Sequence, residues 1–507
     1  MTGRAVSKDE ELAVHFAALA AETAFNDLPA EAVAAAKSVL LDTLGDAIAG
    51  WSQPGVGPLH ELVAEWGGRP ESGVWAYGTR VPALNAALVN GMMCHALEFD
   101  DLHDQAHLHA FGPVLPSALA LAERMGGVNG RELLTALVLG VDAMCRLGLA
   151  VKVEKGWHYT ITFGVFGSAL AAGRILGLDR IGLLNALGIA YSRAAGTEQA
   201  LIEARLVKRL HPGLAAQAGV MAALLSQKGI TGPNQPFEGR LGYFPVHENG
   251  LYDRDRALEG LGSRFEVSNL RIKPYPCCGC THAAIDATLD LVRGTDLSAE
   301  QVAQVEVIGS KLTYDTVGAP FQIRANPQAD AQFSIPYTVA TAIRKRWVSL
   351  EDFQEAAVRD PAVGELASRV RVVVDPTIDE RAVAPVTVRV RTVDGRTLES
   401  RAADTRGHAG NPLPREELEA KFRGCLAFSG RPEFQQRAER LIRTVEKLEE
   451  LDDVRDLAAL LVPQGDVGPG ATLARSAHST GHGHRQARQS QERPGRLQRA
   501  ASTPCQG

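Results

Sequence analysis

Apolar residues recur every three or four positions through most of the first 265 residues. This spacing places them on one face of an α-helix, and short polar or glycine-containing turns separate the segments. No convincing alternation of apolar and polar residues, which would indicate strands, interrupts this part. We therefore predict an all-α domain over residues 1–265. Its helices are expected at 29–50, 82–99, 116–125, 130–149, 162–176, 180–194 and 212–228.

The pattern changes near Phe265. Segments beginning at 304, 369 and 386 alternate branched apolar with charged residues, and Asp394-Gly395 is typical of a hairpin turn. Helical patterns at 281–293 and 335–346 lie between them, so residues 266–414 are predicted to form an α+β lid domain with a small antiparallel sheet covered by helices. Helical spacing returns at 415–428 and 433–451, and we expect residues 415–463 to pack back onto the first domain. The predicted fold class is mainly α with a second, smaller α+β domain.

Composition sets limits on size and order. A chain of 507 residues is longer than a single hydrophobic core usually accommodates, which agrees with two domains. Apolar residues make up 45% and aromatic residues only 6%, a mixture suited to closely packed helices of small side chains. After Leu461 the apolar pattern stops and polar residues dominate, so we predict that residues 464–507 are a disordered tail.

Charge and cysteine content exclude several classes of protein. The net charge is −6, and no basic stripe interleaved with aromatic residues indicates nucleic-acid binding. Seven scattered cysteines do not form the regular framework of a secreted disulfide protein. The first eleven residues lack an apolar signal core, and no apolar run of about 18 residues predicts a membrane span. We expect a cytoplasmic protein with neither nucleic-acid nor membrane partners.

The densest group of chemically active residues is HALEFDDLHDQAHLHAFGP, residues 95–113. It contains Glu98, His103, His107 and His109 at the end of a predicted helix and in the following loop. Three interpretations remain open for this segment alone: a metal site that uses the histidines with a carboxylate, a metal-free acid/base site, and a solvated turn.

Two further groups precede predicted helices. His158 lies just before a helix with small residues, where free N–H groups favour an anion, although a histidine there is also a common structural cap. The segment RLVKRLHPG brings three cations and an imidazole, Arg205, Lys208, Arg209 and His211, to a helix expected to start at Pro212, and such an arrangement suits carboxylates. An ordinary basic surface turn is the alternative.

A fourth group, KPYPCCGCTHAAIDA, joins Lys273 to three cysteines. Cys277 and Cys280 form a C-x-x-C pair, but no second pair completes a zinc or iron–sulfur set. We expect a compact turn that presents Lys273 and the Cys278 thiol to a cleft. The sequence contains no phosphate loop, dinucleotide fingerprint, nucleophile elbow or HExxH motif.

Taken together and in order, these groups resemble the MmgE/PrpD family of 2-methylcitrate dehydratases, cis-aconitate decarboxylases and iminodisuccinate epimerases. The similarity also runs through RVPALNAALVNGMMCHALEFDD, FGVFGSALAAGRILGLD and FSIPYTVATAI, and covers nearly all of residues 10–460. The resemblance implies an all-α domain with an α+β lid, a homodimer, and an interdomain cleft that needs no cofactor or metal.

The resemblance also implies roles for single residues. The family's catalytic positions fall on Glu98, His109, His158, Lys208 and Tyr337, and Lys273 falls on the lysine of the lid. The chain differs from the family pattern at positions expected to contact the substrate. Glu98 replaces an aspartate, Leu102 stands where threonine is common, and Ala110-Phe111 follows His109 in place of proline and a small residue. Cys278 stands where the decarboxylases tend to have histidine. The last difference argues against decarboxylation.

The expected function is a cofactor-independent lyase for a small polycarboxylate, with dehydration of a 2-methylcitrate-like hydroxy acid as the expected reaction. Lys208, Lys273 and Arg205 would hold carboxylates, with His211 and Cys278 beside them, while His109 and His158 would transfer protons. Decarboxylation and epimerisation remain alternatives. A rival class is a metal-dependent lyase or hydrolase built on the His103, His107 and His109 group with the C-x-x-C pair, and a non-enzymatic helical scaffold is a third.

Overall fold

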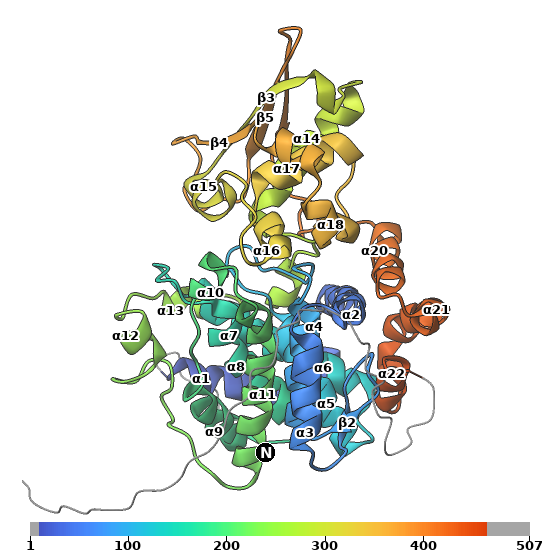
Figure 1. Ribbon diagram of the computed structural model, residues 1–507. Coiled ribbons are helices and arrows are strands. Elements are labelled where there is room, and N and C mark those ends of the chain that lie inside the picture. Colours follow the sequence, from blue (N-terminus) through green and yellow to red (C-terminus); the bar gives the residue numbers. More distant parts are fainter. Residues whose placement is uncertain (1–9, 464–507) are drawn as a thin grey trace, which may run out of the picture. The chain divides into compact units, whose positions relative to one another are not determined.

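A computed structural model of the protein describes residues 10–463 (Figure 1). It confirms the predicted fold class, because a mainly helical body is accompanied by an α+β part with a small sheet. The predicted disordered tail, 464–507, lies outside the described residues. None of the helices in 10–463 combines the length and the apolar character that crossing a membrane requires.

Thirteen helices and one very short hairpin make up the first part of the chain. The hairpin, β1 (Ser72–Gly73) and β2 (Arg80–Val81), is a small exception to the expected absence of strands. The helices are α1 (Leu12–Glu22), α2 (Ala30–Gly50), α3 (Val56–Trp66), α4 (Ala83–His95), α5 (Phe111–Met125), α6 (Gly130–Leu149), α7 (Tyr159–Thr162), α8 (Gly164–Ile175), α9 (Arg180–Tyr191), α10 (Gln199–Ile202), α11 (Val207–Gln227), α12 (Tyr243–His247) and α13 (Arg254–Leu258).

Helices α4 and α11 are side by side in the core of this part, and glycine makes their close approach possible (Figure 1). A Cβ on Gly213 of α11 would lie 2.1 Å from the main-chain oxygen of Leu88 in α4. A Cβ on Gly91 of α4 would lie 2.6 Å from the Cα of Gly213. Because any larger residue would force the helices apart, the two glycines fix the distance between the end of α4 and the start of α11.

Two helices begin earlier than predicted. The expected starts were Pro116 and Pro212, since proline is favoured in a first turn. The structure instead begins α5 at Phe111 and α11 at Val207, with each proline inside its helix. The longer α11 is important, because Lys208 and His211 lie within its first turns rather than in a loop before it.

The second part has a four-stranded sheet with the strand order β4-β3-β5-β6. The β5–β6 hairpin and the β3–β5 pair are antiparallel, but β3 and β4 are parallel, so the prediction of a purely antiparallel sheet was wrong. A parallel pair needs a crossover, which here contains several helices. The strands are β3 (Val302–Gly309), β4 (Val370–Val374), β5 (Val386–Thr392) and β6 (Thr397–Ala402), and the helices are α14 (Gly279–Gly294), α15 (Lys311–Val317), α16 (Pro327–Gln332), α17 (Ile335–Lys345), α18 (Glu355–Val358) and α19 (Pro361–Ala367).

Helices α14 and α17 pack on the sheet and on each other (Figure 1). Their buried side chains form one apolar cluster with those of β3 to β6. Three later helices, α20 (Arg415–Phe428), α21 (Pro432–Glu446) and α22 (Arg455–Leu460), contribute to the apolar cluster of the first part instead. The division of the chain into domains stays a prediction.

Candidate active site

The loop between α4 and α5 carries most of the acidic group found in the sequence. Asp101 fixes this loop, because its carboxylate accepts the main-chain N–H groups of Ala110 at 2.8 Å and Phe111 at 3.1 Å, at the start of α5. Such a cap satisfies donors that the first helical turn leaves free. The loop therefore returns close to its origin, and its first and last residues lie together.

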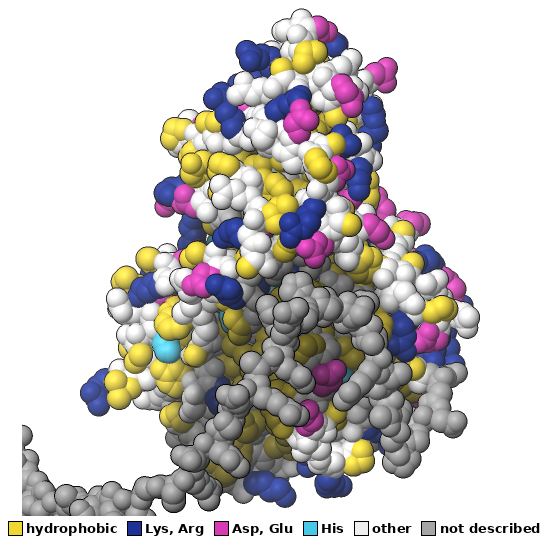
Figure 2. All heavy atoms as spheres, in the orientation of Figure 1, with side chains coloured by type: hydrophobic (Ala, Val, Ile, Leu, Met, Phe, Trp, Pro, Cys, Tyr) yellow, Lys and Arg dark blue, Asp and Glu magenta, His cyan; other side chains and the backbone are white. Residues whose placement is uncertain are grey.

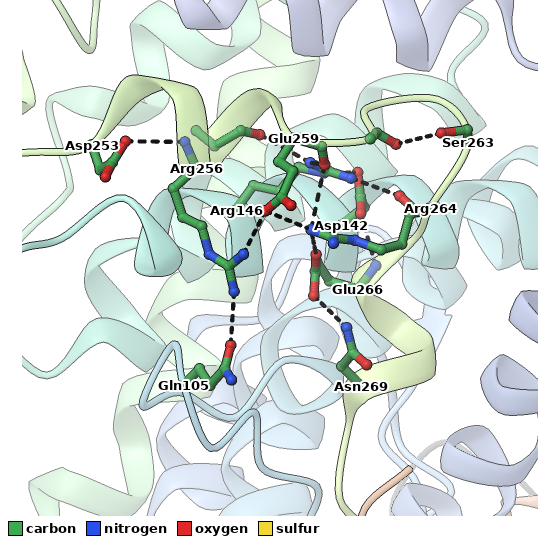
Figure 3. Close-up of polar contacts among 12 residues, drawn as sticks. Gln105, Asp142, Arg146, Asp253, Arg256, Glu259, Ser263, Arg264, Glu266 and Asn269 are labelled. Atoms are coloured by element: carbon green, nitrogen blue, oxygen red, sulfur yellow. Dashed lines mark hydrogen bonds and ion pairs between the residues drawn. The ribbon is translucent and has the colours of Figure 1, made fainter. Parts of the chain in front are cut away.

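A buried network supports the outer side of the same loop (Figure 3). The fully buried Arg146 of α6 donates to the Asp142 carboxylate at 2.7 Å and to the carbonyls of residues 257, 259 and 264. Asp142 accepts the main-chain N–H of Glu266, whose carboxylate accepts from His103 of the loop at 3.1 Å. Burial opposes ionisation of Glu266, but hydrogen bonds from His103 and Asn269 lower its pKa to about 2. His103 thus anchors the loop to α6.

Two imidazoles in this region have a defined tautomer. His109 Nδ1 lies 2.6 Å from the main-chain oxygen of Asp101, and a carbonyl only accepts, so Nδ1 carries the hydrogen. His95 Nδ1 lies 2.8 Å from the Asp100 carboxylate, which it donates to in the same way. The rings of His95 and His109 are 4.6 Å apart between centroids. In the neutral state both rings therefore present an unprotonated Nε2.

Glu98 connects the loop to α11 and to the α+β part. Its carboxylate forms an ion pair with Lys208 and lies 3.5 Å from His95 Nε2, while Lys273 donates to its main-chain oxygen at 3.0 Å. The three side chains of Glu98, Lys208 and Lys273 are all buried. Burial would raise the pKa of Glu98, but the positive charge of Lys208 and its neighbours holds it well below its usual value. Glu98 is therefore a carboxylate.

His158 and His211 complete the group. His158 precedes α7, and its Nδ1 lies 2.8 Å from Nδ1 of His211 in α11, so one of these nitrogens donates and the other accepts. The His158 ring is 6.2 Å from that of His95. Burial, followed by the charge of Lys208, lowers the pKa of His158 well below its usual value and that of His211 to about 4. Burial lowers the pKa of His95 and His109 strongly as well.

Six of the nine candidate residues thus converge: Glu98, His109, His158, Lys208, His211 and Lys273. A narrow pocket of about 20 Å³ adjoins Glu98 and Lys208, and Arg205 lies at its exposed edge, where it pairs with Glu203. This volume holds about one water molecule.

Tyr337 lies in the apolar cluster of the α+β part, and Cys278 packs against it. The Tyr337 hydroxyl donates to the main-chain oxygen of Asp352, and its ring packs against Phe321 and Phe353 in the apolar cluster of the α+β part. Within residues 10–463, no hydrogen bond or ring contact joins Tyr337 to the histidine group. Cys278 caps α14, and a hydrogen bond with the Cys280 thiol, aided by Lys273, lowers its pKa.

The proposed metal ligands are not brought together. His103 contacts Glu266, His107 contacts Glu154, and Cys277 contacts Thr281. Within residues 10–463, the group with three possible ligand atoms inside 4.8 Å is His95, Asp100 and His109. In this group His95 and His109 donate through Nδ1, to the Asp100 carboxylate and to the main-chain oxygen of Asp101 respectively, while their Nε2 atoms are unprotonated in the neutral state.

Three residues of the site stand in the groups that the sequence singled out but received no role there: His95, Asp100 and Arg209. His95 and Asp100 stand in the acidic group, five residues apart. This spacing could have identified them, because it lets a residue at the end of a helix contact the loop that follows. Arg209 is buried, whereas Arg205, four residues earlier, is exposed.

A comparison of sequences agrees with the fold. The pattern of the MmgE/PrpD N-terminal domain matches residues 14–253, and that of the MmgE/PrpD C-terminal domain matches residues 275–448. The chain therefore belongs to the MmgE/PrpD family, as the sequence motifs predicted.

Individual relatives cover most of both chains. The chain is 28% identical to a cis-aconitate decarboxylase-like protein, oryM, of Aspergillus oryzae, over 86% of this chain and 94% of that one. It is 28% identical to human cis-aconitate decarboxylase, over 84% and 89%. It is 26% identical to 2-methylcitrate dehydratase of Cupriavidus necator, over 79% and 87%.

Proposed function

We propose that the protein is a lyase that acts on a small polycarboxylate by proton transfer at a carbon next to a carboxylate, with dehydration of a 2-methylcitrate-like hydroxy acid as the expected reaction. The observation that carries this proposal is the buried group of neutral imidazoles beside Lys208 and Lys273. Family membership and the named relatives support the substrate class.

Lys208 and Lys273 would stabilise the negative charge that forms when the proton leaves carbon. Removing a proton next to a carboxylate creates enolate-like negative charge, which fixed positive charges in a buried site stabilise without reorganisation. Lys208 and Lys273 are held on either side of Glu98, by its carboxylate and its main-chain oxygen respectively. Glu98 thereby positions both ammonium groups.

The tautomers suggest how the proton transfers are divided. His109 has its hydrogen fixed on Nδ1, so its Nε2 is available as the base. His158 and His211 share a hydrogen between their Nδ1 atoms, and the proton that His109 removes from carbon would reach the departing hydroxyl through this pair, so that the hydroxyl leaves as water. Burial lowers the pKa of His109, which keeps this imidazole neutral near pH 7, as a base requires.

Decarboxylation is the second candidate, and the relatives named cis-aconitate decarboxylase favour it. Both reactions pass through a carbanion or enol beside a carboxylate, so the same residues serve either. Cys278, where the decarboxylases tend to have histidine, argues for dehydration. The homodimer, the cytoplasmic location and the independence from cofactors remain predictions.

The test is hydrogen exchange in D₂O, followed by NMR, with 2-methylcitrate, citrate and cis-aconitate. We expect exchange of a carbon-bound hydrogen with at least one acid, and the product distinguishes loss of water from loss of carbon dioxide. Absence of exchange and turnover with all three acids would overturn the proposal. A stoichiometric transition metal in the purified protein, with activity lost to a chelator, would favour the metal-dependent alternative.

A further inference from the structure

Arg209, in the first turn of α11, is a buried cation without a carboxylate partner among residues 10–463. Its side chain is 3% exposed, and it donates through Nη2 to the amide oxygens of Gln328 at 2.9 Å and Gln332 at 3.3 Å. Nη1 is buried without any hydrogen-bond acceptor in the described part of the chain. Two other buried arginines are different, because Arg146 pairs with Asp142 and Arg271 pairs with an aspartate of the α4–α5 loop.

The amide of Gln332 has a fixed orientation. Gln332 donates through Nε2 to the main-chain oxygens of Leu97 at 2.7 Å and Pro276 at 3.0 Å. Carbonyls accept only, so this nitrogen is fixed and the amide oxygen must face Arg209. Gln328 donates through Nε2 to the amide oxygen of Gln53 at 3.0 Å. The side-chain acceptors that contact Arg209 are thus neutral amide oxygens.

Burial of a charge without a counter-ion is costly, and proteins retain such an arrangement mainly where a ligand supplies the missing charge. Arg209 lines the narrow pocket together with Arg205, Lys208 and Arg324, and Glu98 is the one acidic residue of that lining. Glu98 is already paired with Lys208. The pocket therefore has positive charge in excess and a free guanidinium nitrogen.

We propose that Arg209 binds a second carboxylate of the substrate, distinct from the carboxylate beside the reacting carbon, and so selects acids with at least one carboxylate more than the reaction needs. This inference rests on the proposed function and adds a residue and a specificity to it. The planar guanidinium fits a carboxylate through two parallel hydrogen bonds, and Nη1 is the donor that still lacks an acceptor. Because the pocket is narrow, binding would require the wall formed by α16, which carries both glutamines, to move.

The test compares two ligands that differ by one carboxymethyl group, cis-aconitate and maleate, or citrate and malate. Binding to the unmodified protein and to Arg209→Gln is measured by calorimetry. We expect the substitution to weaken the tricarboxylate by about 10- to 100-fold, the value of a charge-assisted bidentate contact, and to change the dicarboxylate by less than about 3-fold. Arg209→Lys retains the charge without the planar fork and should fall between the two.

A matched control is Arg440→Gln, which replaces an exposed arginine of α21 and should change neither affinity. A structural role for Arg209 predicts a different result, namely equal weakening of both ligands and a lower melting temperature. Under the proposal the melting temperature of unliganded Arg209→Gln is unchanged or higher, because an uncompensated buried charge is removed.

The outcomes separate the two proposals. If the unmodified protein exchanges hydrogen with a tricarboxylate, but Arg209→Gln and Arg209→Lys weaken both ligands of a pair equally, Arg209 is not a specificity residue and the proposed function stands. If the unmodified protein neither binds nor exchanges any of the acids, the proposed function is overturned, and this inference with it.

Discussion

Replacing Glu98 by glutamine is the perturbation that tests the electrostatics of the site most directly. The substitution keeps the shape of the side chain but removes its charge, and leaves the ammonium group of Lys208 buried without its partner. Glu98 is 3% exposed and Lys208 is 7% exposed, so water screens the pair weakly. Breaking one side of a buried pair typically costs about 3–5 kcal/mol of stability. We expect Glu98→Gln and Lys208→Met each to fall in this range.

The double variant Glu98→Gln/Lys208→Met should be less destabilised than the sum of the two single variants, because no buried charge of the pair remains. The assay is urea denaturation of the three variants and the unmodified protein, with unfolding followed by circular dichroism. A matched control is Glu355→Gln, which breaks an exposed pair with Arg359 and should cost less than about 1 kcal/mol. Additive effects of the two site substitutions would refute the reasoning, since they would mean that the charges do not compensate each other.

The pH dependence gives a second check on the same pair. The pKa of Glu98 is lowered in the folded protein, so its contribution is present above its usual value of 4.5 and is lost as the pH falls through the folded pKa. The difference in stability between the unmodified protein and Glu98→Gln should therefore be constant near neutral pH and shrink below about pH 4.5. A difference that grows on acidification would show that the carboxyl group is protonated in the fold.

Three further predictions concern the histidines and the helix contact. His109→Asn and His158→Asn should each slow hydrogen exchange in D₂O by roughly 10²–10⁴-fold without changing the circular dichroism spectrum, and near-normal exchange in either variant would remove that residue from the mechanism. Burial lowers the pKa of these histidines and lowers that of His211 to about 4, so their neutral forms stabilise the fold above pH 6.5. The stability that they contribute should decrease as the pH falls from 6.5 towards 4. In urea titrations at each pH, replacing His211 by asparagine should reduce this loss. Gly213→Ala should lower the melting temperature strongly, because its Cβ would lie 2.1 Å from a main-chain oxygen of α4, whereas Gly424→Ala, with open space in α20, should leave it unchanged or raise it.

Local sequence patterns predicted which helices and strands form more accurately than the residues at which they begin and end. The helix expected at 130–149 has these bounds in the structure, where Asn129 caps its first turn. The helix expected from Pro212 begins five residues earlier, at Val207. Proline also fits in the second turn of a helix when packing compensates for the one hydrogen bond that it removes. The parallel pairing of β3 and β4 was beyond sequence reasoning, since alternation defines a strand but not the direction of its neighbour.

The same distinction applies to the site. The motifs identified Glu98 and Lys208, yet their ion pair joins segments 110 residues apart and depends on the approach of α4 and α11. Arg205 and Arg209 look equivalent in the sequence, and only the true start of α11 separates them: Arg205 precedes the helix and is exposed, whereas Arg209 is buried within it. A periodicity argument fails wherever the first residue of a helix is misplaced.

Tyr337 shows a different limit, since the motif similarity assigns it to the site, while its ring packs in the core of the α+β part. Its hydroxyl is bonded to a carbonyl in the core of the α+β part, and a phenol that donates there has no hydrogen left for a substrate. The α4 to α11 contact, by contrast, needs glycine at two positions and delivers His95, Lys208 and His211 to one place. The chemistry of this protein therefore depends less on any one motif than on how closely two helices approach, and a single added methyl group at Gly213 should disturb all three residues together.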